Sequence, residues 1–396
     1  RILSDLKLRM SYGVVGNEGI PPFSSLGLLE TTEAYFGENN IAKGSGPYTR
    51  QNANLKWETT AQSNIGFDLG LIANRINIVA DVYYKKTSDL LLNAPVPYTS
   101  GFDYSFFNVG SLENKGLEFA INTINTVNKI KWNTSFNLAF NRNKVLNLNS
   151  KEGIPADALL GINGWSVINA GVAMGTFYGY KTDGIIQQGE DLNTVPRFID
   201  YAPHYGDRKY VDKNGDGIIN ESDKFVLGNA NPDFSFGMNN TVAYKNFFLS
   251  IFIQGVYGNE IVNFNRFGLE SFDGNSNNST AALLRWTPEN PSNEYPRANA
   301  SPRINTLSDH QVEDGSYLRV KDITLSYDFA KLITGMKLKT SSFRFFITVK
   351  NIFTLTKYTG YDPEVNRFIM NPRSFGADYG SYPSTKIYST GLNITF

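Results

Sequence analysis

The stretch Trp132–Asn141, WNTSFNLAFN, shows the pattern that decides the fold. Aromatic, aliphatic or β-branched residues occupy every second position, and small or polar residues occupy the positions between them. Because successive side chains of a β-strand point to opposite faces, this alternation predicts a strand with one apolar and one polar face. The same alternation recurs in Leu6–Val14 and Ile76–Lys85, while helical periodicity is almost absent. The sequence therefore predicts an all-β protein.

The connections between the expected strands alternate between long and short. Further strands are expected at residues 55–70, 111–123, 234–245, 247–257, 316–330, 342–353 and 385–396. Long connections are expected at residues 16–54, 89–110, 143–233, 258–315 and 354–384. Strands of about 9–11 residues or more, with short turns at one end and long loops at the other, are typical of outer-membrane barrels. We therefore expect about ten strands of an antiparallel transmembrane β-barrel that contacts outer-membrane lipid and carries long extracellular loops.

The end of the chain agrees with that architecture. Phe396 is an aromatic residue that closes an alternating stretch, as expected of the last strand of such a barrel. A soluble or surface glycan-binding β-protein without transport activity is the alternative that the strand pattern leaves open.

The composition argues against several other classes of protein. The 396 residues contain 37 Lys and Arg against 37 Asp and Glu, so the basic excess of a nucleic-acid-binding protein is missing. The chain has no Cys, and its two histidines, His204 and His310, lie far apart in loop-like sequence. No catalytic constellation can be assembled from them, so we expect no enzyme. No run approaches the 18 apolar residues of a transmembrane helix.

Five segments, taken in chain order, carry a family resemblance. They are Asn54–Thr60 (NLKWETT), Asn108–Phe119 (NVGSLENKGLEF), Arg285–Pro291 (RWTPENP), Val312–Arg319 (VEDGSYLR) and Gly360–Val365 (GYDPEV). These segments resemble the C-terminal part of the SusC/RagA family of TonB-dependent outer-membrane transporters. Ala53 stands where Pro is more usual, and Lys350–Ile352 replaces the usual Gln-Asn-Leu.

The resemblance implies a barrel of about 22 strands with an N-terminal plug domain. It also implies TonB-dependent import of oligosaccharides or peptides, a SusD-like lipoprotein over the extracellular mouth, and the outer membrane of a Gram-negative, Bacteroidetes-like cell. No plug is visible in this sequence, and TonB would be contacted through an N-terminal part outside it. About ten strands leave two open edges that lipid cannot satisfy. We therefore expect the C-terminal portion of a longer protein, or a second chain that supplies the missing strands.

One loop has the spacing of a calcium site. Asp212–Asp223 (DKNGDGIINESD) fits the EF-hand loop, with side-chain oxygens from Asp212, Asn214 and Asp216, the carbonyl of Ile218 and a carboxylate from Asp223. Position 12 is Asp rather than Glu, and no amphipathic helix flanks the loop, so we expect a structural Ca²⁺. The alternative is an Asn-, Asp- and Gly-rich turn that needs no metal.

Aromatic residues on the long loops are candidates for substrate binding. Sugar rings stack on exposed Trp and Tyr side chains, so these residues could line a path for a glycan. The alternative is that they pack the loops against each other. The candidates are Trp165, Tyr178, Tyr180 and Trp286.

Overall fold

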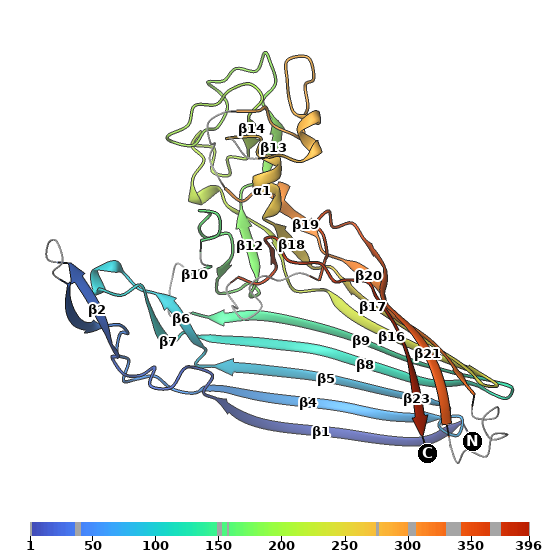
Figure 1. Ribbon diagram of the computed structural model, residues 1–396. Coiled ribbons are helices and arrows are strands. Elements are labelled where there is room, and N and C mark those ends of the chain that lie inside the picture. Colours follow the sequence, from blue (N-terminus) through green and yellow to red (C-terminus); the bar gives the residue numbers. More distant parts are fainter. Residues whose placement is uncertain are drawn as a thin grey trace.

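One antiparallel sheet of ten strands forms the base of the molecule (Figure 1). The computed structural model describes residues 2–35, 41–148, 153–156, 158–274, 277–299, 306–329, 342–364 and 374–395. In the sheet every strand pairs with the next sheet strand along the chain, so the topology is a simple meander. The ten strands are β1 (Leu3–Asn17), β4 (Glu58–Leu71), β5 (Ile76–Ser88), β8 (Ser111–Val127), β9 (Ile130–Asn147), β16 (Phe234–Tyr244), β17 (Phe247–Tyr257), β20 (Tyr317–Asp328), β21 (Ser342–Thr356) and β23 (Ile387–Thr395).

The expected strands and their antiparallel pairing are confirmed. Strand β9 has the alternation from which the fold was inferred, and it pairs in unbroken register with β16 along Ile130–Ala139. Most sheet strands exceed the common strand length of about 5–6 residues, as crossing a membrane requires. The first strand β1 and the last strand β23 each have one neighbour in the sheet, so both edges of the sheet are open.

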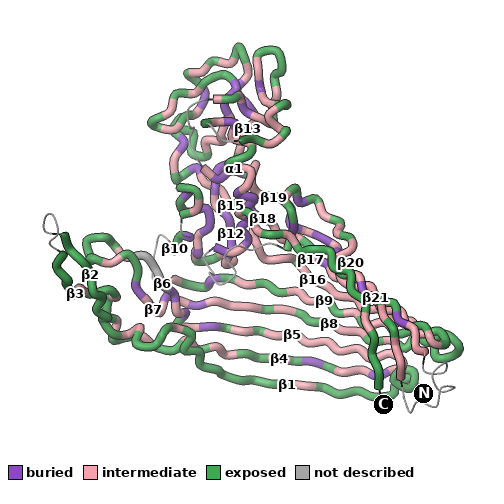
Figure 2. The backbone as a smooth tube through the Cα atoms, in the orientation of Figure 1, coloured by how far each residue is buried: buried purple, intermediate pink, exposed green. Residues whose placement is uncertain are grey.

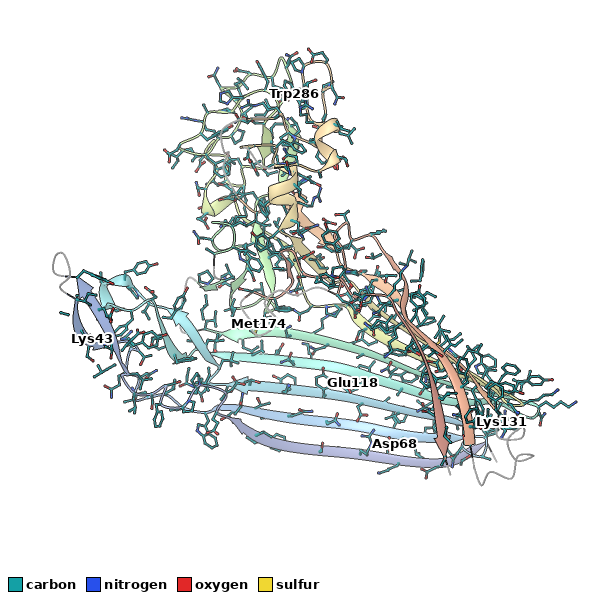
Figure 3. All side chains as sticks on the ribbon, in the orientation of Figure 1. Lys43, Asp68, Glu118, Lys131, Met174 and Trp286 are labelled. Atoms are coloured by element: carbon teal, nitrogen blue, oxygen red, sulfur yellow. The ribbon has the colours of Figure 1, made fainter. Side chains whose placement is uncertain are left out.

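Short turns lie at one end of the sheet and long connections at the other. The turns at residues 72–75, 128–129 and 245–246 join β4 to β5, β8 to β9 and β16 to β17. A short connection is also expected at 331–341, between the strands predicted at 316–330 and 342–353, but it lies outside the described residues. Lys131 beside a short turn and Trp286 in a long connection mark opposite ends of the molecule (Figure 3).

The long connections contain structure that strand periodicity did not predict. The hairpin β2–β3 (Leu29–Tyr35 and Ile41–Pro47) follows β1, and the hairpin β6–β7 (Leu91–Pro95 and Tyr104–Asn108) follows β5. The remaining connections contain several short strands and the short α-helix α1. These are β10 (Ile154–Pro155), β11 (Val167–Ile168), β12 (Thr176–Gly179), β13 (Thr182–Ile185), β14 (Arg208–Tyr210), β15 (Phe225–Asn229), β18 (Glu260–Asn263), α1 (Asn265–Glu270), β19 (Val312–Asp314) and β22 (Ala377–Asp378).

Three long connections pack together into one compact unit above the sheet, which we call the loop body (Figures 1 and 2). It comprises the described residues of 153–233, 258–315 and 357–384. The three-stranded sheet β19–β18–β22 joins two of these connections. The main buried cluster of the chain takes residues from all three: Ala156, Ile162, Trp165, Phe177, Val262, Phe264, Phe267, Leu307 and Ala377.

The ten-stranded sheet has no comparable core of its own. In Figure 2 buried positions concentrate in the loop body, whereas the strands of the sheet are mostly exposed or half-buried. Leu8 and Met10 of β1 are 79% and 81% exposed. Apolar side chains held in regular strands at such exposure need an apolar surrounding other than water. No helix among the described residues is long and apolar enough to cross a membrane.

Candidate functional site

The polar face of the sheet is concave and the other face is apolar. A hollow of about 480 Å³ is lined by residues that include Asp81, Glu118 and Asn137, on neighbouring strands. Asn137 is paired with Ala120 on one side and Gly237 on the other, so these three residues share that face. Its neighbours Phe136 and Leu138 are therefore on the opposite face, where the Phe136 and Phe236 rings lie 6.2 Å apart. The sidedness predicted for β9 is confirmed as a property of the sheet.

Charged groups on the polar face are paired with one another. Arg9 reaches across two strands, with its guanidinium 2.9 Å from Asp68 and 2.8 Å from Asp81. Asn64 donates a further hydrogen bond of 3.1 Å to Asp81. Arg9, Asn64 and Asp81 border a second hollow of about 450 Å³. This face of the sheet therefore presents charged and hydrogen-bonding groups to its hollows.

A glycine in the second resemblance segment makes room for an aromatic ring on this face. The Tyr83 ring covers Gly116, where an added Cβ would lie 2.6 Å from that ring and 2.4 Å from the Phe140 carbonyl oxygen. The Tyr83 hydroxyl donates a hydrogen bond of 3.0 Å to the side-chain oxygen of Asn141. The glycine is required by close packing, since its backbone angle φ is not in the left-handed region.

The fourth and fifth resemblance segments meet in space through a buried arginine. Arg319 of β20, 3% exposed, donates from Nη2 to Asp362 at 2.7 Å and from Nη1 to Glu364. Burial by itself would raise the pKa of Asp362, but hydrogen bonds from Arg319 and from the backbone N–H of Glu364 and Ser384 hold this pKa below its ordinary value. The start of the last long connection is thus held against the wall by an ion pair.

Glu313, in the fourth segment, holds the loop body to the same connection. Its carboxylate accepts hydrogen bonds of 2.8 Å from the backbone and from the hydroxyl of Thr359. It also accepts from Asn263 at 2.9 Å and lies 3.5 Å from the Arg266 guanidinium. Since carboxylates bind several donors at once, one side chain connects three segments of the loop body.

The first two segments also meet. The Asn108 side chain accepts from the backbone N–H of Lys56 at 2.8 Å and donates to the Lys56 carbonyl at 2.9 Å. It donates a further bond of 2.8 Å to the carbonyl of Asp89. Four of the five segments identified in the sequence are therefore junctions between strand ends and long connections. Their spacing along the chain did not reveal which segment meets which.

The predicted loop aromatics are mostly packing residues. Trp165 is fully buried, and its ring lies 5.1 Å from that of Phe264 in an edge-on arrangement. Tyr180 and Trp286 are buried too, and the Trp286 indole donates to the side chain of Gln187 at 2.9 Å. Tyr178 is half-buried. For Trp165, Tyr180 and Trp286 the structure shows the packing alternative, because their faces are covered by other loops.

The predicted calcium loop is tightly wound and held by its own hydrogen bonds. The two carboxylate oxygens of Asp212 accept from the backbone N–H of Gly215 and Gly217, both at 2.7 Å. These bonds lower the pKa of Asp212, chiefly through the one from Gly217. Gly217 has a φ of +80°, which favours glycine. The Asn214 amide oxygen accepts from the backbone N–H of Asp216 at 3.0 Å.

Asp223 is turned inward in that loop. It is fully buried, and its oxygens accept from the backbone N–H of Lys213 at 2.9 Å and of Asn220 at 2.8 Å. Among the described residues no three Asp, Glu or His side chains are grouped as a metal site. A cation here would depend on Asp212 and Asp216 together with the neutral oxygens of Asn214 and Ile218. The terminal residue Phe396, predicted to help barrel assembly, lies outside the described residues.

Together, these features define a class of protein before any comparison. A meander of long strands has a polar concave face and an exposed apolar face, with short turns at one end and a packed loop body at the other. This is the construction of an outer-membrane β-barrel wall with extracellular loops.

The comparisons give the family. The family described as "TonB dependent receptor-like, beta-barrel" matches residues 1–352, and the chain belongs to it. TonB-dependent receptor P3 of Formosa agariphila is 35% identical over 98% of this chain and 39% of its own length. TonB-dependent receptor SusC of Bacteroides thetaiotaomicron is 31% identical over 100% of this chain and 38% of its own length. The chain thus spans about two fifths of the relatives that it matches.

A solved structure confirms the fold. The chain superimposes on a chain of the RagAB peptide transporter with a TM-score of 0.82 and 25% identity, covering all of this chain and 41% of that one. The partial barrel and the resemblance inferred from the sequence are both confirmed, and the soluble glycan-binding alternative is set aside. In this family the concave polar face lines the lumen of the barrel and the apolar face meets lipid. The family is one of receptors and transporters, not of enzymes.

Proposed function

We propose that this chain forms wall and extracellular loops of a transporter that imports oligosaccharides or peptides across the outer membrane in a TonB-dependent way. The observation that carries the proposal is the polar, ion-paired face of the sheet, which opens beneath a loop body that Arg319 of β20 holds to the sheet. A plug and the segment that contacts TonB would come from outside these residues. The similarity to a peptide transporter supports peptides as the substrate class, and the resemblance to the SusC/RagA family implies oligosaccharides as the other.

The class of protein is tested by its behaviour toward detergent. The protein assembled with its full set of strands should require detergent to stay monodisperse and should give a heat-modifiable band on gels. Partition into the aqueous phase without detergent would contradict the proposal. Growth of a deletion strain on single glycans and single peptides would then identify the substrate class.

We also propose a SusD-like lipoprotein partner on the face formed by the long loops. The support is that the hairpins β2–β3 and β6–β7 and the loop body all lie at the same end of the sheet (Figure 1). The exposed rings of Tyr35, Tyr48 and Tyr98 lie in these long connections. Purification from native membranes should recover a lipoprotein in stoichiometric amount. Recovery of the transporter alone, under conditions that keep its loops intact, would count against this partner.

A structural Ca²⁺ in the loop Asp212–Asp223 is a further proposal. The side chains of Asn214 and Asp216 are exposed in a tight turn, and the Asp212 carboxylate has lone pairs beyond the two that accept backbone N–H groups. Asp223 already holds the base of the loop through the backbone N–H groups of Lys213 and Asn220. Calcium would therefore stabilise the exposed outer part of the turn, around Asn214 and Asp216.

A further inference from the structure

The outer part of the loop body contains a cavity that is separate from the hollows on the polar face of the sheet. Its volume is about 110 Å³, several times the ~10–15 Å³ that a single water molecule needs. Three parts of the chain form its walls: the region around β14, the helix α1 with the residues after it, and Pro296 together with residues 306–311 (Figure 1). The lining residues that matter here are Phe198, Tyr201, Arg208, Arg266, Glu270 and His310.

Most charges around this cavity already have partners. Arg266 lies 2.7 Å from Glu270 and 3.5 Å from Glu313, and His310 lies 2.9 Å from Glu270. Burial lowers the pKa of His310, so the imidazole is neutral at neutral pH. The Glu270 carboxylate is held ionised, since hydrogen bonds from His310 and Arg266 outweigh its burial and lower its pKa. The charge of Arg266 is therefore balanced by the carboxylates of Glu270 and Glu313.

A second ion pair borders the cavity. Asp207 is 4% exposed and lies 2.9 Å from the Arg297 guanidinium. Its other oxygen accepts from the Tyr201 hydroxyl and from the backbone N–H of His204, both at 3.1 Å. Both carboxylate oxygens of Asp207 therefore already accept hydrogen bonds from these donors. Asp207 does not pair with Arg208, the next residue in the chain.

Arg208 differs from these cations. Its side chain donates to the carbonyl oxygen of Glu294 at 3.1 Å, and no carboxylate of the described residues lies within ion-pair distance of it. The residue is only half-exposed, and burial lowers the pKa of Arg208. A guanidinium stays charged in proteins and carries five N–H donors in a planar fork, so most of the Arg208 donors are not used by the described residues.

Flat apolar groups face the same space. The Phe198 ring packs edge-on against Tyr180 at 5.5 Å and against Tyr210 at 5.3 Å, which fixes its orientation. Gly206, with φ at +86°, brings the backbone so close to Trp286 that an added Cβ would lie 2.4 Å from its ring. The wall beside Arg208 is therefore rigid, and it combines aromatic surface with a guanidinium that lacks an anionic partner.

We propose that this cavity binds one anionic oxo group, a carboxylate or a sulfate ester, carried by a unit the size of a monosaccharide or an amino acid. Arg208 is the recognising cation, because a guanidinium fork matches two oxygens of such a group. The aromatic wall takes the apolar side of the unit. The site is in the loop body, away from the polar face of the sheet, and binding there does not depend on transport.

Binding to the whole purified transporter in detergent tests the site. The probes are glucuronate, glucose 6-sulfate, N-acetylglutamate and neutral glucose, each titrated by calorimetry up to millimolar concentration. The anionic probes should bind and glucose should not. A preference for glucuronate or glucose 6-sulfate would identify a sugar acid, and a preference for N-acetylglutamate an acidic peptide. No binding of any anion, or equal binding of glucose and glucuronate, would overturn the proposal.

The variant Arg208→Gln should weaken anion binding by about tenfold or more, as expected for the loss of charge-assisted hydrogen bonds. The matched control is Arg142→Gln, at an exposed ion pair with Asp233 at the rim of the sheet, and it should leave the affinity unchanged. If Arg208→Gln changes the protease cleavage pattern, the variant has disturbed the fold of the loop body. Anion binding is then measured on Arg208→Lys instead. Lysine keeps the charge but not the fork, so a several-fold loss supports the site and an unchanged affinity overturns it.

Discussion

At the scale of single residues, buried ion pairs connect segments that are distant in the sequence. Arg319 was part of one recognisable segment and Asp362 and Glu364 were part of another, 43 residues or more further on. Nothing in either segment indicated that the two meet. The pairing arises because β20 and β21 are neighbours in the sheet, which brings the start of the last long connection back over Arg319.

The variant Arg319→Met should destabilise this junction by about 3–5 kcal/mol, because it leaves the buried Asp362 carboxylate without its cation. The measurement is protease cleavage at residues 357–364 together with the urea midpoint of the loop body. Arg142→Met is the control, since its pair with Asp233 is exposed and should contribute about 0–1 kcal/mol. Equal effects of the two variants would contradict the role assigned to burial.

The same junction should respond to acid in a defined direction. The pKa of Asp362 is lowered from 3.8, so its contribution to stability is present above pH 3.8 and is lost as pH falls through the lowered value. Cleavage at residues 357–364 should therefore stay constant from neutral pH down to about 4 and increase below it. In Asp362→Asn this acid step should be missing, and an unchanged step would assign it to another group.

At the scale of elements, alternation predicts long strands well and short ones poorly. β9 alternates from Ile130 to Asn141 because one face meets lipid and the other the lumen. β12 and β14, of 4 and 3 residues, are too short to show any period. Such strands form where the surrounding loops bring two backbones together, so propensity along the chain carries little information about them.

The faces of β9 lead to a paired substitution. Phe136→Arg places a charge on the lipid face at a cost of about 2–4 kcal/mol near the midplane, so assembly should be impaired. Asn137→Arg directs the charge into the lumen, beside Glu118, and should be tolerated. The amount of heat-modifiable barrel in the outer-membrane fraction measures both. Similar yields from the two variants would contradict the assigned register.

At the scale of the whole molecule, the sheet and the loop body are stabilised in different ways. The loop body has a dry core drawn from three connections, whereas the sheet depends on its ladder of hydrogen bonds and on lipid. A perturbation of one loop should therefore loosen part of the loop body without unfolding the wall. The proposed calcium loop provides such a perturbation.

Chelation of calcium should increase protease cleavage within Asp212–Asp223 and leave the sheet strands protected. Extracellular modules bind calcium at about 10⁻⁴–10⁻³ M, so millimolar calcium should restore protection. In Asp212→Asn the response to chelator should be lost. In Asp223→Ala cleavage should be high with and without calcium, because the internal clamp on Lys213 and Asn220 is missing. Identical cleavage of the unchanged protein in both conditions would refute a bound ion.

The sequence by itself determined the strands, their two faces, the end of the sheet that carries the long connections, and the family. These are properties of neighbouring residues, since side-chain alternation is repeated every two positions and is read along the chain. The tertiary structure alone decided that three connections form one body, that Trp165 and Trp286 are buried in it, and that no carboxylate of the described residues forms an ion pair with Arg208. Those outcomes depend on contacts between residues far apart in sequence, and no local period records them.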